Sequence, residues 1–231
     1  MSVYVVIDPG HGGKDPGAIG FGINEKDVVL TLAKKLNDHL GQYEKAVVSL
    51  TRWDDRFIDL SERAEMANQR GADLFISIHN NAATPTANGF ESFIHDNAGS
   101  KTANYQNVLH KHIMDYLSRY NIRDRGKKRA DFAVLRNTKM SAILLENLFI
   151  TNEKENKLLR DNEFLDGLAA AIVAGVADAF GLKKKDTTQK PMYRVTVDGD
   201  VIYDTAYETK ITEAVMNAVR EEAEEISVKK R

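Results

Sequence analysis

The chain has 231 residues, of which 42% are hydrophobic and 29% charged, a composition typical of a globular rather than a disordered protein. It contains no cysteine, so disulfides, thiolate nucleophiles and thiolate metal ligands are excluded. The net charge of −2 provides no long-range attraction to nucleic acid, and no apolar run reaches the roughly 18 residues of a membrane span. The start of the chain reads as a strand and lacks the basic residues and long apolar run of a secretory signal, so we expect synthesis in the cytoplasm.

Short apolar runs alternate with amphipathic stretches over the first 182 residues. Helical periodicity predicts helices over residues 27–40, 60–70, 102–120 and 163–180, the second opened by Asp59 or Ser61 and the last ended by Gly181. Apolar runs and alternating residues predict strands over residues 3–7, 46–51, 73–79, 89–95 and 142–146. Strands that alternate with helices favour an α/β fold, with a mostly parallel, twisted sheet flanked by helices.

The composition changes near the C-terminus. Residues 183–191 are polar, with successive lysines and a proline, and are typical of a linker. Residues 192–231 predict a small α+β module: a hairpin turning at 198–200, a helix over 210–225 and a last strand at 226–229. About 40 residues are marginal for an autonomous fold, so we expect this module to dock on another surface or to form a homodimer.

Four side chains that bind metals or carry protons lie near strand ends or helix starts. His11 follows the first strand, His79 ends the third, Glu146 ends the last strand of the first domain, and Glu25 precedes the first helix. Because ligands of open α/β sheets bind beyond the carboxyl ends of the strands, these side chains are expected to converge at one edge.

Two imidazoles and one carboxylate form the ligand set of a catalytic zinc, and a second carboxylate suits proton transfer in amide hydrolysis. Each residue also has a plainer interpretation. A histidine at a strand end is more often structural, and Glu25 at a helix start is an ordinary partner of the helix dipole. The glycines around His11 also suit a tight turn, whereas a phosphate loop is disfavoured because the GK[ST] ending is absent.

The combined motifs resemble the Amidase_3 family of N-acetylmuramoyl-L-alanine amidases, of the phage endolysin and autolysin type. The resemblance covers about residues 1–182 and rests on IDPGHGGKDPGAIG, NEKDVVL, LTRWDD, LSERAEMAN, ADLFISIHNNA, GFESF and AVLRNTKMSAILLENLFITN. It implies a zinc carboxypeptidase-like fold and hydrolysis of the bond between the lactyl group of N-acetylmuramic acid and L-alanine in peptidoglycan. By position and size, residues 192–231 resemble the cell-wall-binding modules appended to phage endolysins.

The resemblance implies that His11, Glu25 and His79 bind one zinc ion and that Glu146 is the catalytic acid/base. The chain departs from the family beside this site, with Ser141 where proline is frequent and Leu148-Phe149 where Gly-Phe is frequent. These departures concern the positioning of the substrate rather than the metal.

Two other functions fit the same residues. A zinc peptidase or carboxypeptidase acting on the stem peptide would need a cation for the terminal carboxylate, which Arg52, Arg63 or the basic stretch 123–129 could supply. That basic stretch is otherwise either a solvated loop or a rim that meets anionic stem peptides and wall polymers. A catalytically inactive wall-binding protein is the third candidate, although the presence of all four site residues disfavours it.

Overall fold

The computed structural model describes residues 2–186, 193–198, 200–205, 215, 218 and 225–230. The chain divides into two compact units, Met1–Lys184 and Lys185–Arg231. Most of the expected linker and of the helix expected over 210–225 lies outside the described residues. Within them, no helix is long and apolar enough to cross a membrane.

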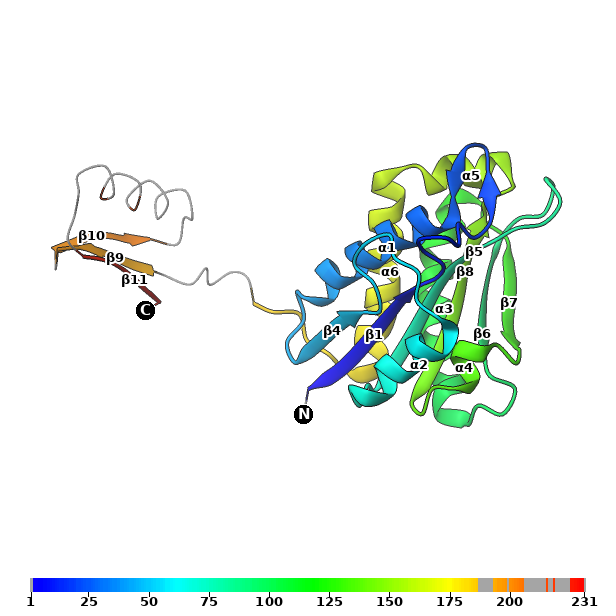
Figure 1. Ribbon diagram of the computed structural model, residues 1–231, viewed down its shortest axis with the longest axis horizontal. Coiled ribbons are helices and arrows are strands. Elements are labelled where there is room, and N and C mark those ends of the chain that lie inside the picture. Colours follow the sequence, from blue (N-terminus) through cyan, green and yellow to red (C-terminus); the bar gives the residue numbers. More distant parts are fainter. Residues whose placement is uncertain are drawn as a thin grey trace. The chain divides into compact units, whose positions relative to one another are not determined.

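A six-stranded sheet forms the centre of the N-terminal unit, with the strand order β4-β1-β5-β8-β6-β7 (Figure 1). Neighbouring strands are parallel except for β6 and β8, which are antiparallel. The predicted mostly parallel sheet is therefore confirmed. The strands are β1 (Val3–Pro9), β4 (Ala46–Leu50), β5 (Leu74–Asn81), β6 (Phe90–Ile94), β7 (Asp124–Arg129) and β8 (Ser141–Phe149).

Helices cover both faces of this sheet, because successive strand residues point to opposite faces and both faces are apolar. On β1, Val5 and Ile7 face the larger core, formed with α1, α3, α5 and α6, whereas Val6 faces the smaller core formed with α2 and α4. The helices are α1 (Glu25–Leu40), α2 (Leu60–Gln69), α3 (Ser100–Leu117), α4 (Ala133–Arg136), α5 (Glu153–Leu159) and α6 (Asn162–Phe180). A 3₁₀ turn, Ser118–Tyr120, follows α3, and the short strands β2 (Ile19–Gly20) and β3 (Ile23–Asn24) form a hairpin before α1.

Local hydrogen bonds account for the predicted helix ends. The Asp59 carboxylate accepts a hydrogen bond from the backbone N–H of Ser61, which caps α2. Gly181 ends α6 with φ 64°, the left-handed conformation that glycine adopts most readily.

The structure corrects three predicted boundaries. The basic stretch 123–129 is not a solvated loop: its expected role as a rim for anionic stem peptides stays a prediction, but residues Asp124–Arg129 form β7, an edge strand that pairs with β6. It has no apolar residue to reveal it, and such charges are characteristic of protected edge strands. His79 and Glu146 do not end their strands, since β5 continues to Asn81 and β8 to Phe149. Glu25 is the first residue of α1 rather than part of the preceding loop.

The C-terminal unit contains a three-stranded antiparallel sheet of order β10-β9-β11. Its strands are β9 (Tyr193–Val197), β10 (Asp200–Thr205) and β11 (Ile226–Lys230). Asp198, in the turn between β9 and β10, has φ 49°, as a tight hairpin turn requires.

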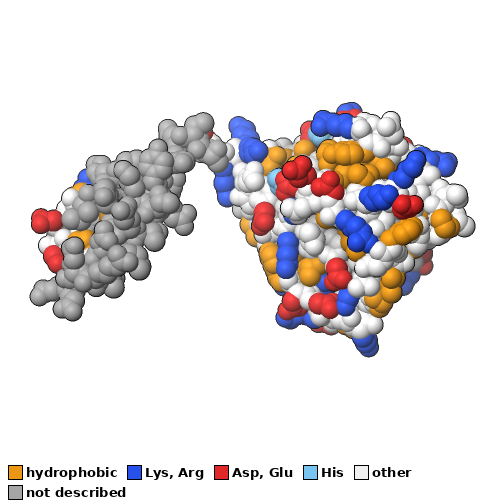
Figure 2. Space-filling view, turned by 90° about the horizontal axis from the view of Figure 1, so that it is seen from above, with side chains coloured by type: hydrophobic (Ala, Val, Ile, Leu, Met, Phe, Trp, Pro, Cys, Tyr) orange, Lys and Arg blue, Asp and Glu red, His pale blue; other side chains and the backbone are white. Residues whose placement is uncertain are grey.

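The surface of the N-terminal unit is mixed on the face that Figure 2 shows. Lysine and arginine side chains are interspersed there with acidic and hydrophobic ones. No field of a single sign covers this face.

The close approach of α3 and α6 gives a test of the packing. A Cβ atom added at Gly175 of α6 would lie 2.9 Å from the Cα atom of Leu109 on α3. Gly175→Val should therefore push the two helices apart and lower the free energy of unfolding by about 1–3 kcal/mol, measured by denaturant titration. Ala174→Val, at a half-buried position one residue earlier, is the matched control; an equal loss in both variants would contradict the packing explanation.

Candidate metal centre

The loop after β1 presents His11 and leaves room for the His79 ring. His11 has φ 59°, in the left-handed region that non-glycine residues rarely adopt. A Cβ atom at Gly10 would lie 2.2 Å from Cε1 of His79, so this position requires glycine. The two imidazole rings lie edge to face, with centroids 4.9 Å apart.

Two buried arginines hold this loop in place. Arg63 donates to the carbonyl oxygens of Pro9 (2.7 Å) and His11 (2.6 Å) and pairs with Asp8 at 2.9 Å. Arg52 donates to the carbonyl oxygens of Pro9 (3.0 Å) and Gly10 (2.7 Å). Arg52 is 1% exposed and Arg63 2%, so neither side chain is accessible to the terminal carboxylate of a peptide. The suggestion that one of these arginines binds the carboxylate of a peptidase substrate is therefore wrong.

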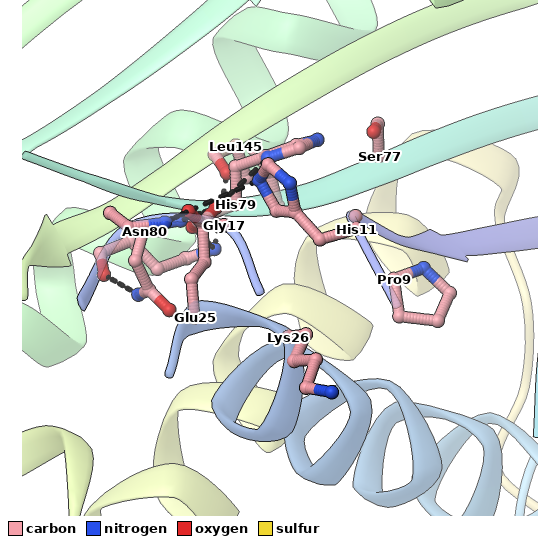
Figure 3. A network of polar contacts seen from close by, with 12 residues as sticks. Pro9, His11, Gly17, Glu25, Lys26, Ser77, His79, Asn80 and Leu145 are labelled. Carbon is pink, nitrogen blue, oxygen red and sulfur yellow. Dashed lines mark hydrogen bonds and ion pairs between the residues drawn. The ribbon is translucent and has the colours of Figure 1, made fainter. Parts of the chain in front are cut away.

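Glu25 bridges the two histidines (Figure 3). Its Oε2 atom lies 3.1 Å from Nε2 of His11, and its Oε1 atom lies 3.0 Å from Nδ1 of His79. One potential ligand atom from each of the three residues lies within 4.8 Å of the other two. The three donors come from separate elements: the loop after β1, the start of α1, and β5. The fold brings them together at one point.

Backbone groups also orient the Glu25 carboxylate. The N–H of Ala18 donates to Oε2 and the N–H of Asn80 donates to Oε1, both at 2.9 Å. A Cβ atom at Gly17 would lie 2.7 Å from both Glu25 Oε2 and Cδ2 of His11. The missing side chains at Gly10 and Gly17 therefore keep the donors close together.

The charges of these residues are strongly coupled. Burial opposes ionisation of Glu25, but hydrogen bonds and charge from His11 and His79 hold its pKa well below the usual range. Burial alone would lower the pKa of each histidine. Hydrogen bonding to Glu25 and nearby carboxylate charge raise the pKa of both instead, with Asp15 contributing at His11 and Glu146 at His79.

Asp15 supports His11 from outside the cluster. Its Oδ2 atom lies 2.8 Å from Nδ1 of His11, and its Oδ1 atom accepts from the N–H of Gly17 at 3.0 Å. A carboxylate on the second ring nitrogen fixes the orientation of a histidine and increases its basicity as a ligand. Two imidazoles and one carboxylate, oriented in this way, fit a divalent metal such as zinc.

Glu146 lies beside the cluster on the neighbouring strand. It is the register partner of His79 in the β5–β8 ladder, which becomes irregular immediately afterwards. Its Oε2 atom is buried and has no hydrogen-bond partner among the described residues. Burial, followed by the charges of Glu25 and Glu91, raises the pKa of Glu146 to about 7, against the opposing effect of His79.

The remaining histidines lie elsewhere. His39, His95 and His112 form ion pairs with exposed aspartates. His110 is buried between Ser92 Oγ (2.8 Å) and Asp124 Oδ1 (2.9 Å), linking α3 to β6 and β7. Because Ser92 is 1% exposed, this Ser–His–Asp chain presents no nucleophile at the surface.

Sequence reasoning brought the four principal residues to one edge but missed their supports. Asp15, Asn80 and Glu91 were not singled out. Asp15 follows His11 by four residues within the quoted glycine-rich motif, and this spacing was the one available signal. The contacts of Asn80 and Glu91 depend on strand register, which the sequence does not reveal.

Comparison with known proteins agrees with this geometry. Residues 5–178 match the Amidase_3 family model, described as N-acetylmuramoyl-L-alanine amidase. The endolysin of Bacillus phage SPP1 is 46% identical over 193 residues, which cover 83% of this chain and 71% of the phage protein. The sporulation-specific N-acetylmuramoyl-L-alanine amidase of Bacillus subtilis is 40% identical over 196 residues, covering 84% of this chain and 74% of that protein.

Solved structures show the same fold. The catalytic domain of the amidase CwlV from Bacillus (Paenibacillus) polymyxa superposes with a TM-score of 0.74 at 36% identity, covering 78% of this chain and 99% of that domain. An N-acetylmuramoyl-L-alanine amidase from Clostridium difficile gives a TM-score of 0.75 at 36% identity, covering 78% of this chain and 97% of the other. Sequence motifs, fold and the clustered donors therefore agree that this chain belongs to the Amidase_3 family of N-acetylmuramoyl-L-alanine amidases.

Proposed function

We propose that this protein hydrolyses the amide bond between the lactyl group of N-acetylmuramic acid and L-alanine in peptidoglycan, and that it requires one zinc ion. His11, Glu25 and His79 would bind the ion, and Glu146 would be the catalytic acid/base. The observation that carries the proposal is the convergence of three donor atoms within 4.8 Å, next to a buried carboxyl group, in a chain of this family. Zinc is favoured by the His-Glu-His donor set, although such a set also accepts other divalent metals.

The chemistry divides between the metal and the protein. When bound, zinc supplies a Lewis acid that polarises a carbonyl and acidifies a water molecule. In the metal-free protein, burial raises the pKa of Glu146 to about 7, so this carboxyl group is poised to exchange a proton near neutral pH. It therefore takes the proton from the attacking water and delivers it to the departing nitrogen of L-alanine, as general acid–base catalysis requires.

The peptidase alternative loses part of its support. Two of the three cation sources for a terminal carboxylate, Arg52 and Arg63, are buried and donate to backbone carbonyls. The inactive-protein alternative is disfavoured because all four site residues lie in a chemically competent arrangement. Identification of the new chain ends decides among the three, since an amidase releases peptides that begin with L-alanine.

The similarity to a phage endolysin suggests where the protein is made and where it acts. We propose cytoplasmic synthesis followed by action on the cell wall after release, as an endolysin would act, and wall binding by the C-terminal unit. Nothing in the described part of that unit supports the homodimer expected from the sequence.

Glu146→Gln tests the proton-transfer role. The variant should lose about 10²–10⁴-fold in the release of peptides that begin with L-alanine, measured by mass spectrometry of digested walls, while keeping its zinc content. Because the raised pKa means that charged Glu146 destabilises the folded state at neutral pH, the variant should not unfold more easily. Glu153→Gln, at an exposed site on α5, is the control; undiminished activity of Glu146→Gln would refute the role.

Asp15→Asn tests the support of His11. Loss of the carboxylate on Nδ1 of His11 should weaken zinc binding by about 10–100-fold, measured by competition with a chelator. Asp38→Asn, an exposed change on α1, should leave the affinity unchanged. An unaltered affinity in Asp15→Asn would mean that this bond does not orient the ligand.

Metal binding should release protons, because zinc needs neutral imidazoles while the pKa values of His11 and His79 are raised in the metal-free protein. Affinity should therefore rise as the pH increases through the raised pKa values of these two histidines, and the number of released protons should fall over the same interval. Isothermal titration in buffers of different ionisation enthalpy measures both. His112→Asn, which removes a half-buried histidine of α3 far from the metal centre in sequence, should release the same number of protons as the wild type; heats that are independent of the buffer would contradict the prediction.

A further inference from the structure

A second charged cluster lies beside Glu146. Glu91 on β6 is the register partner of Glu146 in the antiparallel β6–β8 ladder, so both side chains lie on the same face of the sheet. Its Oε1 atom accepts from the side-chain amide of Asn81 at 2.7 Å. Its Oε2 atom accepts from Nε of Arg125 at 3.0 Å and from the ammonium group of Lys128.

The cluster contains more positive than negative charge. Glu91 is 5% exposed, whereas the side chains of Arg125 and Lys128, both on β7, are 28% and 38% exposed. Burial would raise the pKa of Glu91, but the bonds to Lys128, Asn81 and Arg125 hold it below its usual range, so the carboxylate is charged. One buried anion paired with two partly exposed cations leaves a net positive charge toward solvent.

The two cations are also held in place and keep free donors. The Arg125 guanidinium lies over the Phe149 ring, 4.8 Å from its centroid. An ammonium group has three donors, and in the described part of the chain Lys128 uses one of them on Glu91. The remaining donors are available to a second carboxylate.

The order of the strands across the sheet suggests how the bound substrate would be oriented. β5 carries His79, β8 carries Glu146, β6 carries Glu91, and β7 carries the two cations, in that order across the sheet. The acid that protonates the leaving nitrogen must lie on the side of the leaving group, within hydrogen-bond reach. In the proposed reaction the leaving group is the stem peptide, so the peptide extends from Glu146 toward β7.

We propose that Lys128 and Arg125 bind a carboxylate of the stem peptide close to the cleaved bond, which makes them specificity-determining residues for free-acid over amidated stems. This inference rests on the proposed amidase function and assigns the polarity of the substrate across the site. One cation, such as Arg125, is enough to balance the charge of Glu91. The second cation, Lys128, is the more exposed of the two. If Lys128 binds the substrate, its substitution should affect free-acid and amidated substrates differently, whereas a purely structural role would affect both equally.

The experiment compares two soluble muropeptides that differ only in whether the stem carboxylate nearest the L-alanine is free or converted to the carboxamide. Full-length, zinc-loaded protein is used, and peptides that begin with L-alanine are quantified by liquid chromatography with mass spectrometry. The wild type should prefer the free acid by about tenfold in kcat/KM, mostly through KM, as expected for one charge-assisted contact. Lys128→Gln should reduce this preference to near one.

Lys127→Gln is the matched control. It removes the same charge one residue earlier, on the opposite face of β7, where Lys127 bonds to Asn107 of α3. The control should keep the preference of the wild type. Arg125→Gln should also reduce the preference, with thermal unfolding followed in parallel because this side chain also covers Phe149.

Different results would contradict the amidase function and the carboxylate site. No release of peptides beginning with L-alanine from either substrate by the wild type would overturn the amidase function itself. Release from both substrates at equal rates by the wild type, or an unchanged preference in Lys128→Gln, would overturn the carboxylate site alone.

Discussion

The metal centre depends on two buried guanidinium groups beneath the loop after β1. Arg52 and Arg63 are almost fully buried, and Asp8 is the carboxylate that pairs with Arg63, at 2.9 Å. Carbonyl oxygens of the loop supply most of the remaining hydrogen-bond acceptors. Burying a guanidinium is costly unless its donors are satisfied, so the loop must keep these carbonyls pointing inward. That requirement explains why His11 is held in a left-handed conformation, with its imidazole directed toward Glu25.

The two carboxylates of the centre differ because their surroundings differ. Glu25 receives two imidazoles and two backbone N–H groups, which stabilise its charged form. Glu146 is half-buried, and its buried Oε2 atom has no partner among the described residues, so its protonated form is favoured. A permanently charged carboxylate suits a metal ligand, and one that titrates near neutrality suits proton transfer. The proposed roles follow from this contrast rather than from residue type.

Sequence patterns predicted the sheet, the helices on its faces, one helix cap and one helix end, because apolar periodicity and capping residues are local signals. Asp59 and Gly181 are examples. They did not predict β7, whose charged residues are stabilised by pairing with β6 rather than by burial of apolar side chains. Glu25 was indistinguishable from an ordinary helix-start residue until the family resemblance was used. Arg63 was considered only as a cation for a peptide carboxylate, because its partners Asp8 and His11 lie more than 50 residues away.

The chain order separates the metal centre from the proposed carboxylate site. β1, α1, β5 and β8 carry the metal donors and Glu146, whereas β6, α3 and β7 are inserted between β5 and β8 in the sequence and form the far edge of the sheet. Because β6 is antiparallel to β8, Glu91 can lie directly beside Glu146 and place the cations of β7 next to the centre. In the proposed function, substitutions in the inserted segment would therefore alter which stem peptides bind, while the proposed metal donors on the other elements stay in place.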